Sequence, residues 1–578
     1  MIEEKLELIT LPAGDLIEVD MDDPGRSTIC GAFRQYVKIG ENTRSMITYM
    51  PEDWRQNNRC IVIAPPSDAE VTQFLVSSGL KKFADNTKVL LCVIEPANGA
   101  WNTDGSDSRF MNAAFKATQA REYYVVMQDA VYGMGFGDGA VIAHQAVLNM
   151  TSEYSGLATF GPITDEVFCA SEQDVDAGTQ NEEFFVSGKM AQLPVWMYVP
   201  EKTPAVEKLA EFWKITNADV EVPLFDQFGT EIYLPKPLKN TSKINDDNIA
   251  QFRLTVDTEG TTDEAKLEYV WEYVGAARRH RSYSSKVLRY FRDPMQTGAT
   301  YHTMKVDGMM REWYEYVPDK CKNSAAPVPV VVVFHGRGGN GETFYDITDM
   351  SLVAQERGFI AVFPTADIYQ VKKGYYRGVR LWNGEQNGKP FDSIPFVRKM
   401  IADISERWNV DESRIFAFGQ SSGGHMATCC ALKASDIFCA VAPCSGFTFP
   451  GFQMMGCPQG PMFEGGYPPV FFMIGKDDKF FGMVDTFKPI PENASCGQFV
   501  KYLIETYKLE EEADSYTAYP INYFVWHNEN KIPILQVGLV DDMPHANYAE
   551  QSRIAYDQFF AKWRKDKEGN RYYMGRRV

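Results

Sequence analysis

Short runs of β-branched and aromatic residues alternate along this chain with segments in which apolar residues recur every three or four positions. In the second half, the apolar run Val328–Phe334 precedes a helical pattern over Met350–Arg357, and a further apolar run covers 359–363. Strands and helices that alternate in this way form a mostly parallel sheet with helices on both faces. The pattern therefore predicts an α/β fold.

The same plan occurs twice. Each copy begins with a hairpin-like segment, whose second strand covers 45–50 in the first copy and 312–317 in the second. Further matches pair short motifs, glycine-rich turns and the strands after them: Trp101-Asn102 with Trp382-Asn383, Asp107-Ser108 with Asp392-Ser393, Phe110 with Phe396, Gly137 with Ser421, and Val195 with Val470. The separation stays between 267 positions (Met50 to Val317) and 286 positions (Phe110 to Phe396). This near-constant separation indicates duplication of a whole domain.

The duplication predicts two tandem domains, over residues 1–290 and 291–578. Their boundary is expected within 282–300, after a helix predicted over 264–278 and before the second hairpin. A chain of 578 residues is also too long for one hydrophobic core.

Composition and charge narrow the classes of partner. The chain is 44% hydrophobic and 23% charged, as folded soluble proteins are. Its net charge of −19 repels nucleic acid phosphates and anionic lipid, so neither nucleic acid nor membrane is expected as a partner. The N-terminus has no basic segment followed by an apolar run, which makes a cytoplasmic location the expectation.

The sequence predicts no metal and no organic cofactor. Eleven cysteines include no C-x-x-C pair, and seven histidines include no H-E-x-x-H motif. Residues 135–140 do fit the dinucleotide fingerprint G-x-G-x-x-A. That fingerprint normally follows the first strand of its domain, whereas several elements precede it here, so nucleotide binding is disfavoured.

Gly419-Gln420-Ser421-Ser422-Gly423 has the form G-x-S-x-G between a predicted strand and a predicted helix. In this motif the serine is a nucleophile on a strained turn, and the glycines let the chain double back. Upstream, His335-Gly336-Arg337-Gly338-Gly339 directly follows the strand Val328–Phe334 and is similar to the H-G-G-G loop that supplies an oxyanion donor. The expected oxyanion donors are the backbone N–H groups of Ser422 and Arg337.

A serine nucleophile needs a histidine base and a carboxylate that orients it, which follow in the order serine, acid, histidine. His545, on a loop after the predicted strand 532–540, is preferred over His527, which lies in a polar stretch. His425 is expected to pack or to support the site, because its helix carries it away from the hydroxyl. Among the carboxylates after the strand 469–474, Asp478 is preferred and Asp477 is the rival; Asp541 and Asp542 remain less favoured.

Together these motifs resemble the polyhydroxyalkanoate depolymerase and feruloyl esterase branch of the α/β-hydrolase superfamily, over roughly 305–564. The resemblance implies hydrolysis of carboxylic esters through an acyl-enzyme, without a cofactor. It also implies two tandem α/β-hydrolase-like domains. The chain departs from the family where Ile474-Gly475 replaces a His-Gly pair before the acid, and where Arg337 replaces a small residue or cysteine.

The expected substrate is a small aromatic ester of the feruloyl or cinnamoyl type, or a short-acyl ester, and a second copy of the chain is a further candidate partner. His335, Gly336, Gln420 and Trp382 are predicted to border the substrate pocket. Residues 447–467 either cap the site or pack as a covering loop, and 479–531 is the other candidate lid. A serine peptidase or acyltransferase and a noncatalytic binding or scaffold protein remain alternatives.

The first copy lacks every predicted catalytic group. Gly137 occupies the position of Ser421, Thr203 that of Asp478, and no histidine lies between His144 and His280. Pro65 and Pro66 replace the oxyanion loop, and proline has no N–H to donate. Residues 1–290 are therefore expected to form a noncatalytic, degenerate copy that serves stability, dimerisation or substrate access.

Overall fold

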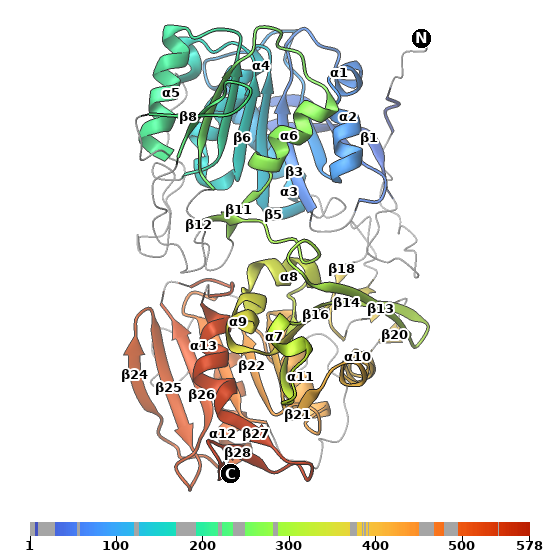
Figure 1. The fold of residues 1–578 in the computed structure, drawn as a ribbon, viewed down its shortest axis with the longest axis vertical. Coiled ribbons are helices and arrows are strands. Elements are labelled where there is room, and N and C mark those ends of the chain that lie inside the picture. The colour runs from blue at the N-terminus through green and yellow to red at the C-terminus, as the bar shows by residue number, and fades with distance from the viewer. Residues whose placement is uncertain are drawn as a thin grey trace.

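The described residues form two ten-stranded sheets, one in each half of the chain, with helices on both sides of each sheet (Figure 1). This computed structural model describes residues 6–9, 29–54, 58–120, 126–168, 192–217, 222–234, 249–280, 287–369, 379–383, 385–386, 389–390, 392–449, 468–478, 495–541, 543–548 and 550–578. No helix within these ranges combines the length and the apolar character that crossing a membrane requires.

The first sheet has the strand order β1-β2-β4-β3-β5-β6-β7-β10-β9-β8. Its strands from β4 to β10 in that order are parallel, and antiparallel strands flank them at both edges. The strands are β1 (Gly31–Ile39), β2 (Asn42–Met50), β3 (Asn58–Ala64), β4 (Leu90–Ile94), β5 (Val126–Phe136), β6 (Gly156–Phe160), β7 (Val195–Val199), β8 (Leu224–Phe225), β9 (Glu231–Tyr233) and β10 (Phe252–Val256). The helices are α1 (Val71–Ser77), α2 (Leu80–Thr87), α3 (Ser106–Ala120), α4 (Gly139–Asn149), α5 (Pro204–Asn217) and α6 (Glu264–Val274), with short turns η1 (Thr151–Glu153) and η2 (Asp165–Phe168).

The second sheet has the order β13-β14-β16-β15-β21-β22-β23-β26-β25-β24, which repeats the first position by position. Its strands are β13 (Thr300–Val306), β14 (Met309–Tyr316), β15 (Val328–Phe334), β16 (Ile360–Pro364), β21 (Val410–Gln420), β22 (Ala440–Cys444), β23 (Val470–Gly475), β24 (Asp514–Ala518), β25 (Ile521–His527) and β26 (Pro533–Val540). The helices are α7 (Asp319–Lys322), α8 (Gly341–Ile347), α9 (Met350–Arg357), α10 (Ile394–Arg407), α11 (Ser422–Lys433), α12 (Ser495–Tyr507) and α13 (Gln551–Ile554), the last continued by η5 (Ala555–Phe559) and η6 (Phe560–Lys562). Short pairs complete this half: β17 (Ile368–Tyr369) with β18 (Val379–Arg380), β19 (Glu385–Gln386) with β20 (Lys389–Pro390), and β27 (Trp563–Lys565) with β28 (Arg571–Tyr573) and β29 (Arg576–Arg577).

The two halves share contacts as well as topology, as the matched motifs of the sequence predict. In each copy an indole N–H donates to a carbonyl of the loop after the third strand, and an arginine lies over a phenylalanine ring. The indole bonds are Trp101 Nε1 to Pro65 O at 2.9 Å and Trp382 Nε1 to His335 O at 2.8 Å, and the cation–π pairs are Arg44 over Phe110 at 4.3 Å and Arg311 over Phe396 at 4.1 Å. Each half has a mostly parallel sheet with helices on both faces, so the predicted α/β fold is confirmed.

One predicted element boundary was wrong. The helix predicted over 264–278 ends at Val274, because Gly275 caps it and residues Ala277–His280 form the strand β11.

The hairpin of β11 (Ala277–His280) and β12 (Val287–Tyr290) contacts both halves (Figure 1). On the side of the first sheet, the Arg279 guanidinium donates to the carbonyl of Tyr154 at 2.9 Å. On the side of the second sheet, Arg278 and Arg289 both pair with Asp346, whose carboxylate is fully buried. Burial raises the pKa of a carboxyl group, but here the two arginines outweigh that effect and lower the pKa of Asp346. Buried ion pairs thus connect the two domains.

Candidate active site

Ser421 lies on the sharp turn between β21 and α11. Its backbone has φ 55° and ψ −118°, a conformation that is strained for a residue with a side chain. The glycine at 423 is required, because a Cβ atom there would come within 1.9 Å of the Phe334 carbonyl oxygen. The predicted strand–turn–helix context and the strained backbone of this motif are confirmed.

Ser421, His545 and Asp478 form one continuous chain of hydrogen bonds. The Ser421 Oγ lies 2.8 Å from His545 Nε2, and His545 Nδ1 lies 2.9 Å from Asp478 Oδ2. A carboxylate only accepts, so Nδ1–H donates to it and the neutral imidazole leaves Nε2 free to accept the hydroxyl proton. Asp478 is fully buried, whereas the His545 side chain is 20% exposed. This geometry suits general-base activation of the hydroxyl from the open side of the site.

The parallel sheet explains why three distant segments meet. Ser421 follows β21, Asp478 follows β23 and His545 lies on the loop after β26. Neighbouring β23 and β26 are parallel, as are all strands from β21 to β26 in the sheet order, so these loops emerge at the same edge. The sheet thereby brings together residues 124 positions apart in the sequence.

The structure places the alternative residues elsewhere. The Asp477 amide bonds to the Met543 carbonyl at 3.0 Å, and Asp541 accepts from Asn522 and lies 3.5 Å from Lys476. Asp542 lies outside the described residues. His527 pairs with Asp514 at 3.6 Å, and His425 is buried in α11, where burial lowers its pKa to about 4.

The loop after β15 covers the serine. A Cβ atom on Gly336 would lie 3.5 Å from the Ser421 Cβ and 2.6 Å from Gln420 Oε1, so a larger residue here would displace the Gln420 side chain. The Gly338 and Gly339 amides are occupied, since they donate to the carbonyls of Arg380 and Gly336. The Ser422 amide lies in the first turn of α11, where N–H groups have no acceptor within the helix.

His335 and Trp382, predicted to border the substrate pocket, are fully buried in the structure. His335 Nδ1–H donates to the Gly336 carbonyl at 2.6 Å, and Nε2 accepts from the Ala366 amide at 2.9 Å. Burial lowers the pKa of His335 to about 3, which keeps this neutral tautomer. Both residues therefore fix the shape of the loop from behind, whereas Gly336 lies beside Ser421 and Gln420.

The two predicted lid segments have different outcomes. Phe447, at the start of 447–467, is buried and packs against Phe472 and Phe499, so this end is a packed covering loop; 450–467 lies outside the described residues. Residues 479–494 also lie outside them. The remainder of 479–531 is not a lid, since it forms α12 and the strands β24 and β25 of the main sheet.

One supporting segment was missed by the sequence analysis. The Ser421 amide donates to the Cys444 carbonyl at 2.8 Å, and Gly446 approaches so closely that a Cβ atom there would lie 1.9 Å from the Ser421 carbonyl oxygen. Ser445 between them has φ 44°. The sequence signal for this segment is the pair Ser445-Gly446 directly after a predicted strand. Such pairs are too common in turns to indicate a functional site.

The similarity to a known protein family lies in the same half of the chain as Ser421. Residues 314–454 match the family model described as esterase PHB depolymerase, a segment that contains the oxyanion loop and Ser421. This finding confirms the resemblance inferred from the motifs.

Curated relatives match the chain over part of their own length. Feruloyl esterase B of Neurospora crassa is 32% identical over 133 residues, which cover 23% of this chain and 43% of that protein. The probable acetylxylan esterase A of Neosartorya fischeri is 26% identical over 140 residues, covering 23% and 34%. The chain thus spans less than half the length of these relatives. Among solved structures, an acetyl xylan esterase from Aspergillus awamori is similar with a TM-score of 0.32 and 16% identity, over 45% of this chain and 99% of that one.

The first copy keeps the backbone turn of the second copy but not its side chains. Gly137 has φ 55°, the same value as Ser421, and Gly161 approaches it as Gly446 approaches Ser421. Pro66 packs against Gly137, where an added Cβ would lie 3.2 Å from the proline ring, and Ser67 bonds to Asp138 across the turn. The position of the hydroxyl is thereby covered by the neighbouring loop.

Proposed function

We propose that the protein is a serine carboxylic-ester hydrolase, with Ser421 as nucleophile, His545 as base and Asp478 as the residue that orients the base. The single observation that carries the proposal is the hydrogen-bonded chain from Ser421 Oγ through His545 to Asp478. The esterase domain over 314–454 supports ester hydrolysis as the reaction class.

In the first step His545 Nε2 takes the proton from Ser421 Oγ, which attacks the carbonyl carbon of the ester. The resulting imidazolium keeps its Nδ1–H bond to Asp478, whose buried negative charge stabilises it. The same Nε2–H then protonates the departing alcohol, which leaves an acyl group on Ser421.

The tetrahedral intermediate places a negative charge on the former carbonyl oxygen. The N–H groups of Ser422 and Arg337 are the proposed donors, one from the helix start and one from the loop beside Ser421. Fixed donors of this kind need no reorganisation as the charge develops. In the second half-reaction His545 takes a proton from water, which attacks the acyl-enzyme and releases the acid.

The proposed substrates are small aromatic esters of the feruloyl or cinnamoyl type, or short-acyl esters. Relatives with the printed names feruloyl esterase B and probable acetylxylan esterase A motivate both classes. Residues 1–290 are proposed to be noncatalytic, because Gly137 offers no nucleophile at the matching turn.

Turnover of p-nitrophenyl acetate, methyl ferulate and an aminoacyl anilide by the wild type and by Ser421→Ala tests the proposal. We expect turnover of the esters only, and a loss of about 10⁴-fold or more in kcat in the variant. Amide turnover without ester preference would indicate a peptidase. Ester turnover that requires an added alcohol would indicate an acyltransferase. Absence of any turnover that depends on Ser421 would leave a binding protein.

A further inference from the structure

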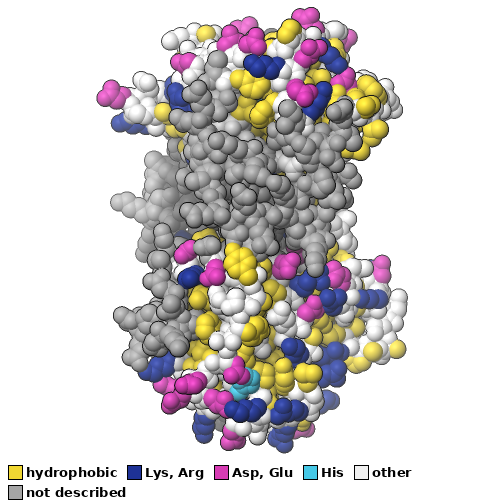
Figure 2. Space-filling model, turned by 90° about the vertical axis from the view of Figure 1, so that its left-hand side faces the viewer, with side chains coloured by type: hydrophobic (Ala, Val, Ile, Leu, Met, Phe, Trp, Pro, Cys, Tyr) yellow, Lys and Arg dark blue, Asp and Glu magenta, His cyan; other side chains and the backbone are white. Residues whose placement is uncertain are grey.

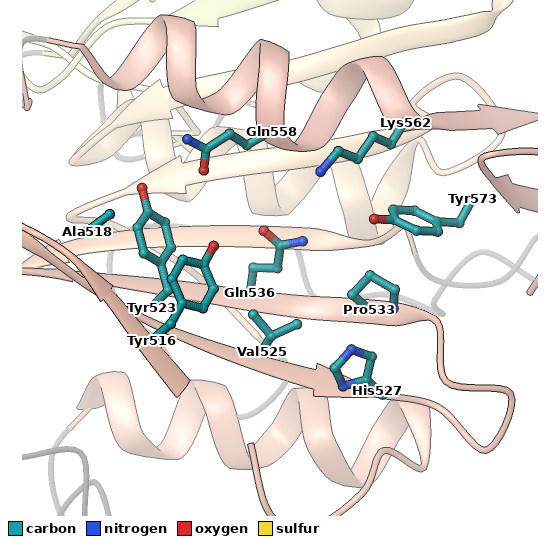
Figure 3. Close-up of a pocket in the computed structure, with 10 residues that line it drawn as sticks. All are labelled: Tyr516, Ala518, Tyr523, Val525, His527, Pro533, Gln536, Gln558, Lys562 and Tyr573. Carbon is teal, nitrogen blue, oxygen red and sulfur yellow. The ribbon is translucent and has the colours of Figure 1, made fainter. Parts of the chain in front are cut away.

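A second pocket lies in the catalytic half, away from Ser421, between the edge of the sheet and the C-terminal helical segment (Figure 3). Its volume is about 420 Å³, within the range of small-molecule sites. Ten residues line it: Tyr516, Ala518, Tyr523, Val525, His527, Pro533, Gln536, Gln558, Lys562 and Tyr573. Figure 2, which faces the β24 side of Figure 1, shows hydrophobic side chains among Lys, Arg, Asp and Glu on this half.

Two stacked tyrosines form one wall of the pocket. Tyr516 on β24 pairs in register with Tyr523 on β25, and their ring centroids lie 4.7 Å apart with an interplanar angle of 13°. Tyr516 is 51% exposed although it belongs to the sheet. Exposed aromatic rings offer a flat apolar surface and a hydroxyl, a combination that suits contact with another ring.

The floor of the pocket carries an amide that can bind a ligand. Gln536 is the one polar residue of β26, and the residue as a whole is 7% exposed. Its side chain points into the pocket between Tyr523 and Lys562 (Figure 3), and its amide is not among the buried polar atoms of the described residues that lack a partner. The amide is therefore open to the pocket, where its N–H groups and its oxygen can hydrogen-bond to a bound molecule.

The charge at the pocket is positive. Lys562 lines it, and no carboxylate of the described residues lies within ion-pair distance of its ammonium, although the chain has 77 Asp and Glu against 58 Lys and Arg. His527 is the second nitrogen base, and Asp514, its neighbour at 3.6 Å, has an 84% exposed side chain outside the lining. No Asp or Glu lines the pocket.

We propose that this pocket binds a small ring compound that carries a carboxylate. The tyrosine wall contacts the ring, the Gln536 amide hydrogen-bonds to its polar groups, and Lys562 pairs with the carboxylate. Two sources share this chemistry: an aromatic acid such as the reaction described above would release, and a uronic acid of a glycan. The site is distinct from the catalytic one, because Gln536 lies inside β26 whereas His545 follows the end of that strand.

Calorimetric titration of the full chain carrying Ser421→Ala, which removes turnover, tests the proposal. The ligands are ferulate and glucuronate, each with its neutral counterpart, methyl ferulate and glucose. We expect one acid or both to bind with a Kd on the order of 0.1–1 mM, and the neutral compounds to bind at least about 10-fold more weakly. Binding of ferulate alone identifies the aromatic source, and binding of glucuronate alone the glycan source.

Lys562→Met, added to the same background, should weaken binding of the acid about 10-fold or more, whereas Lys567→Met, an exposed lysine outside the lining, should leave it unchanged. Gln536→Leu should also weaken binding of the acid, because it removes the amide that hydrogen-bonds to the ligand. The proposal is overturned if neither acid binds, if acids and neutral compounds bind equally, or if Lys562→Met has no effect. Hydrolysis of p-nitrophenyl acetate by Lys562→Met with Ser421 intact should equal that of the wild type.

Discussion

Two adjacent carboxylates show how much the backbone decides at the scale of single residues. Asp477 and Asp478 follow the same strand. The sequence favours Asp478 as the residue that orients the histidine, but it leaves Asp477 as a rival. In the structure the Asp478 side chain is buried against His545, whereas Asp477 is partly exposed. The difference arises in the turn after β23, where the Asp478 amide donates to the Gly475 carbonyl and the Asp477 amide to the Met543 carbonyl, and only the Asp478 side chain faces the histidine loop.

Asp478→Asn should lower kcat for p-nitrophenyl acetate by about 10⁴-fold, because an amide no longer holds His545 in the correct tautomer. Asp477→Asn, the matched neighbour, should stay within about threefold of the wild type, as expected for a carboxylate that does not contact the base. Steady-state kinetics of both variants checks this. Equal losses in the two variants would contradict the assignment of Asp478.

Three buried histidines should remain neutral far below their usual pKa. Burial lowers the pKa to about 3 for His335 and His144, and to about 4 for His425. The unfolded chain takes up protons at these positions near pH 6.5, whereas the native state does not. The contribution of these histidines to the free energy of unfolding should therefore be fully present above pH 6.5. It should be lost progressively as the pH decreases toward 4.

Imidazole resonances of the ¹⁵N-histidine-labelled protein provide the measurement. We expect three of the seven histidines to show no titration between pH 8 and pH 5. Denaturant unfolding over the same range should show lower stability at the acidic end. Full titration of all seven histidines near pH 6.5 in the folded protein would contradict the burial described for them.

At the scale of elements, much of the fold could be predicted because the local signals are strong. The run Val328–Phe334 is apolar throughout and is the fully buried strand β15. The ends of elements were less predictable, since Gly275 stops α6 while the apolar spacing continues into β11. Tertiary packing also decides the roles of His335 and Trp382, which are fully buried. The motif places both residues near the serine, but it does not predict whether their side chains point toward the serine or away from it.

The repeated indole bond provides a matched pair of variants. Trp382→Phe removes the N–H bond to the His335 carbonyl, and Trp101→Phe removes the equivalent bond to the Pro65 carbonyl. Each should cost about 1 kcal/mol in the free energy of unfolding. Only Trp382→Phe should also lower kcat, by about 10-fold, with a smaller change in KM, because it loosens the oxyanion loop. Equal kcat values for the two variants would contradict the role of Trp382 in holding that loop.

At the scale of the whole molecule, duplication was visible in the sequence, whereas the way the copies connect was not. Arg278 and Arg289 pair with Asp346, which lies 57 or more positions away in the sequence. No sequence motif indicates that these three residues are partners. Their burial makes the connection strong, since removing one member of a buried ion pair leaves the others uncompensated. A cytoplasmic location, a second copy of the chain as partner and the noncatalytic role of the first domain stay predictions.

Asp346→Asn should lower the free energy of unfolding by about 3–5 kcal/mol, because two buried guanidinium groups lose their shared carboxylate. Asp319→Asn, which removes a carboxylate that is 91% exposed, should leave the free energy of unfolding nearly unchanged. Differential scanning calorimetry of both variants is the measurement, and two separated transitions in Asp346→Asn are expected. A single transition at the wild-type temperature would contradict a buried connection between the domains.

Reaction with a fluorophosphonate, followed by peptide mass spectrometry, tests the nucleophile most directly. The reagent phosphonylates a serine only where a base has activated the hydroxyl. We predict one adduct per chain, on the peptide that contains Ser421, with labelling lost in His545→Ala. A folded wild-type protein that stays unlabelled, or that carries its adduct on another residue, would contradict the account.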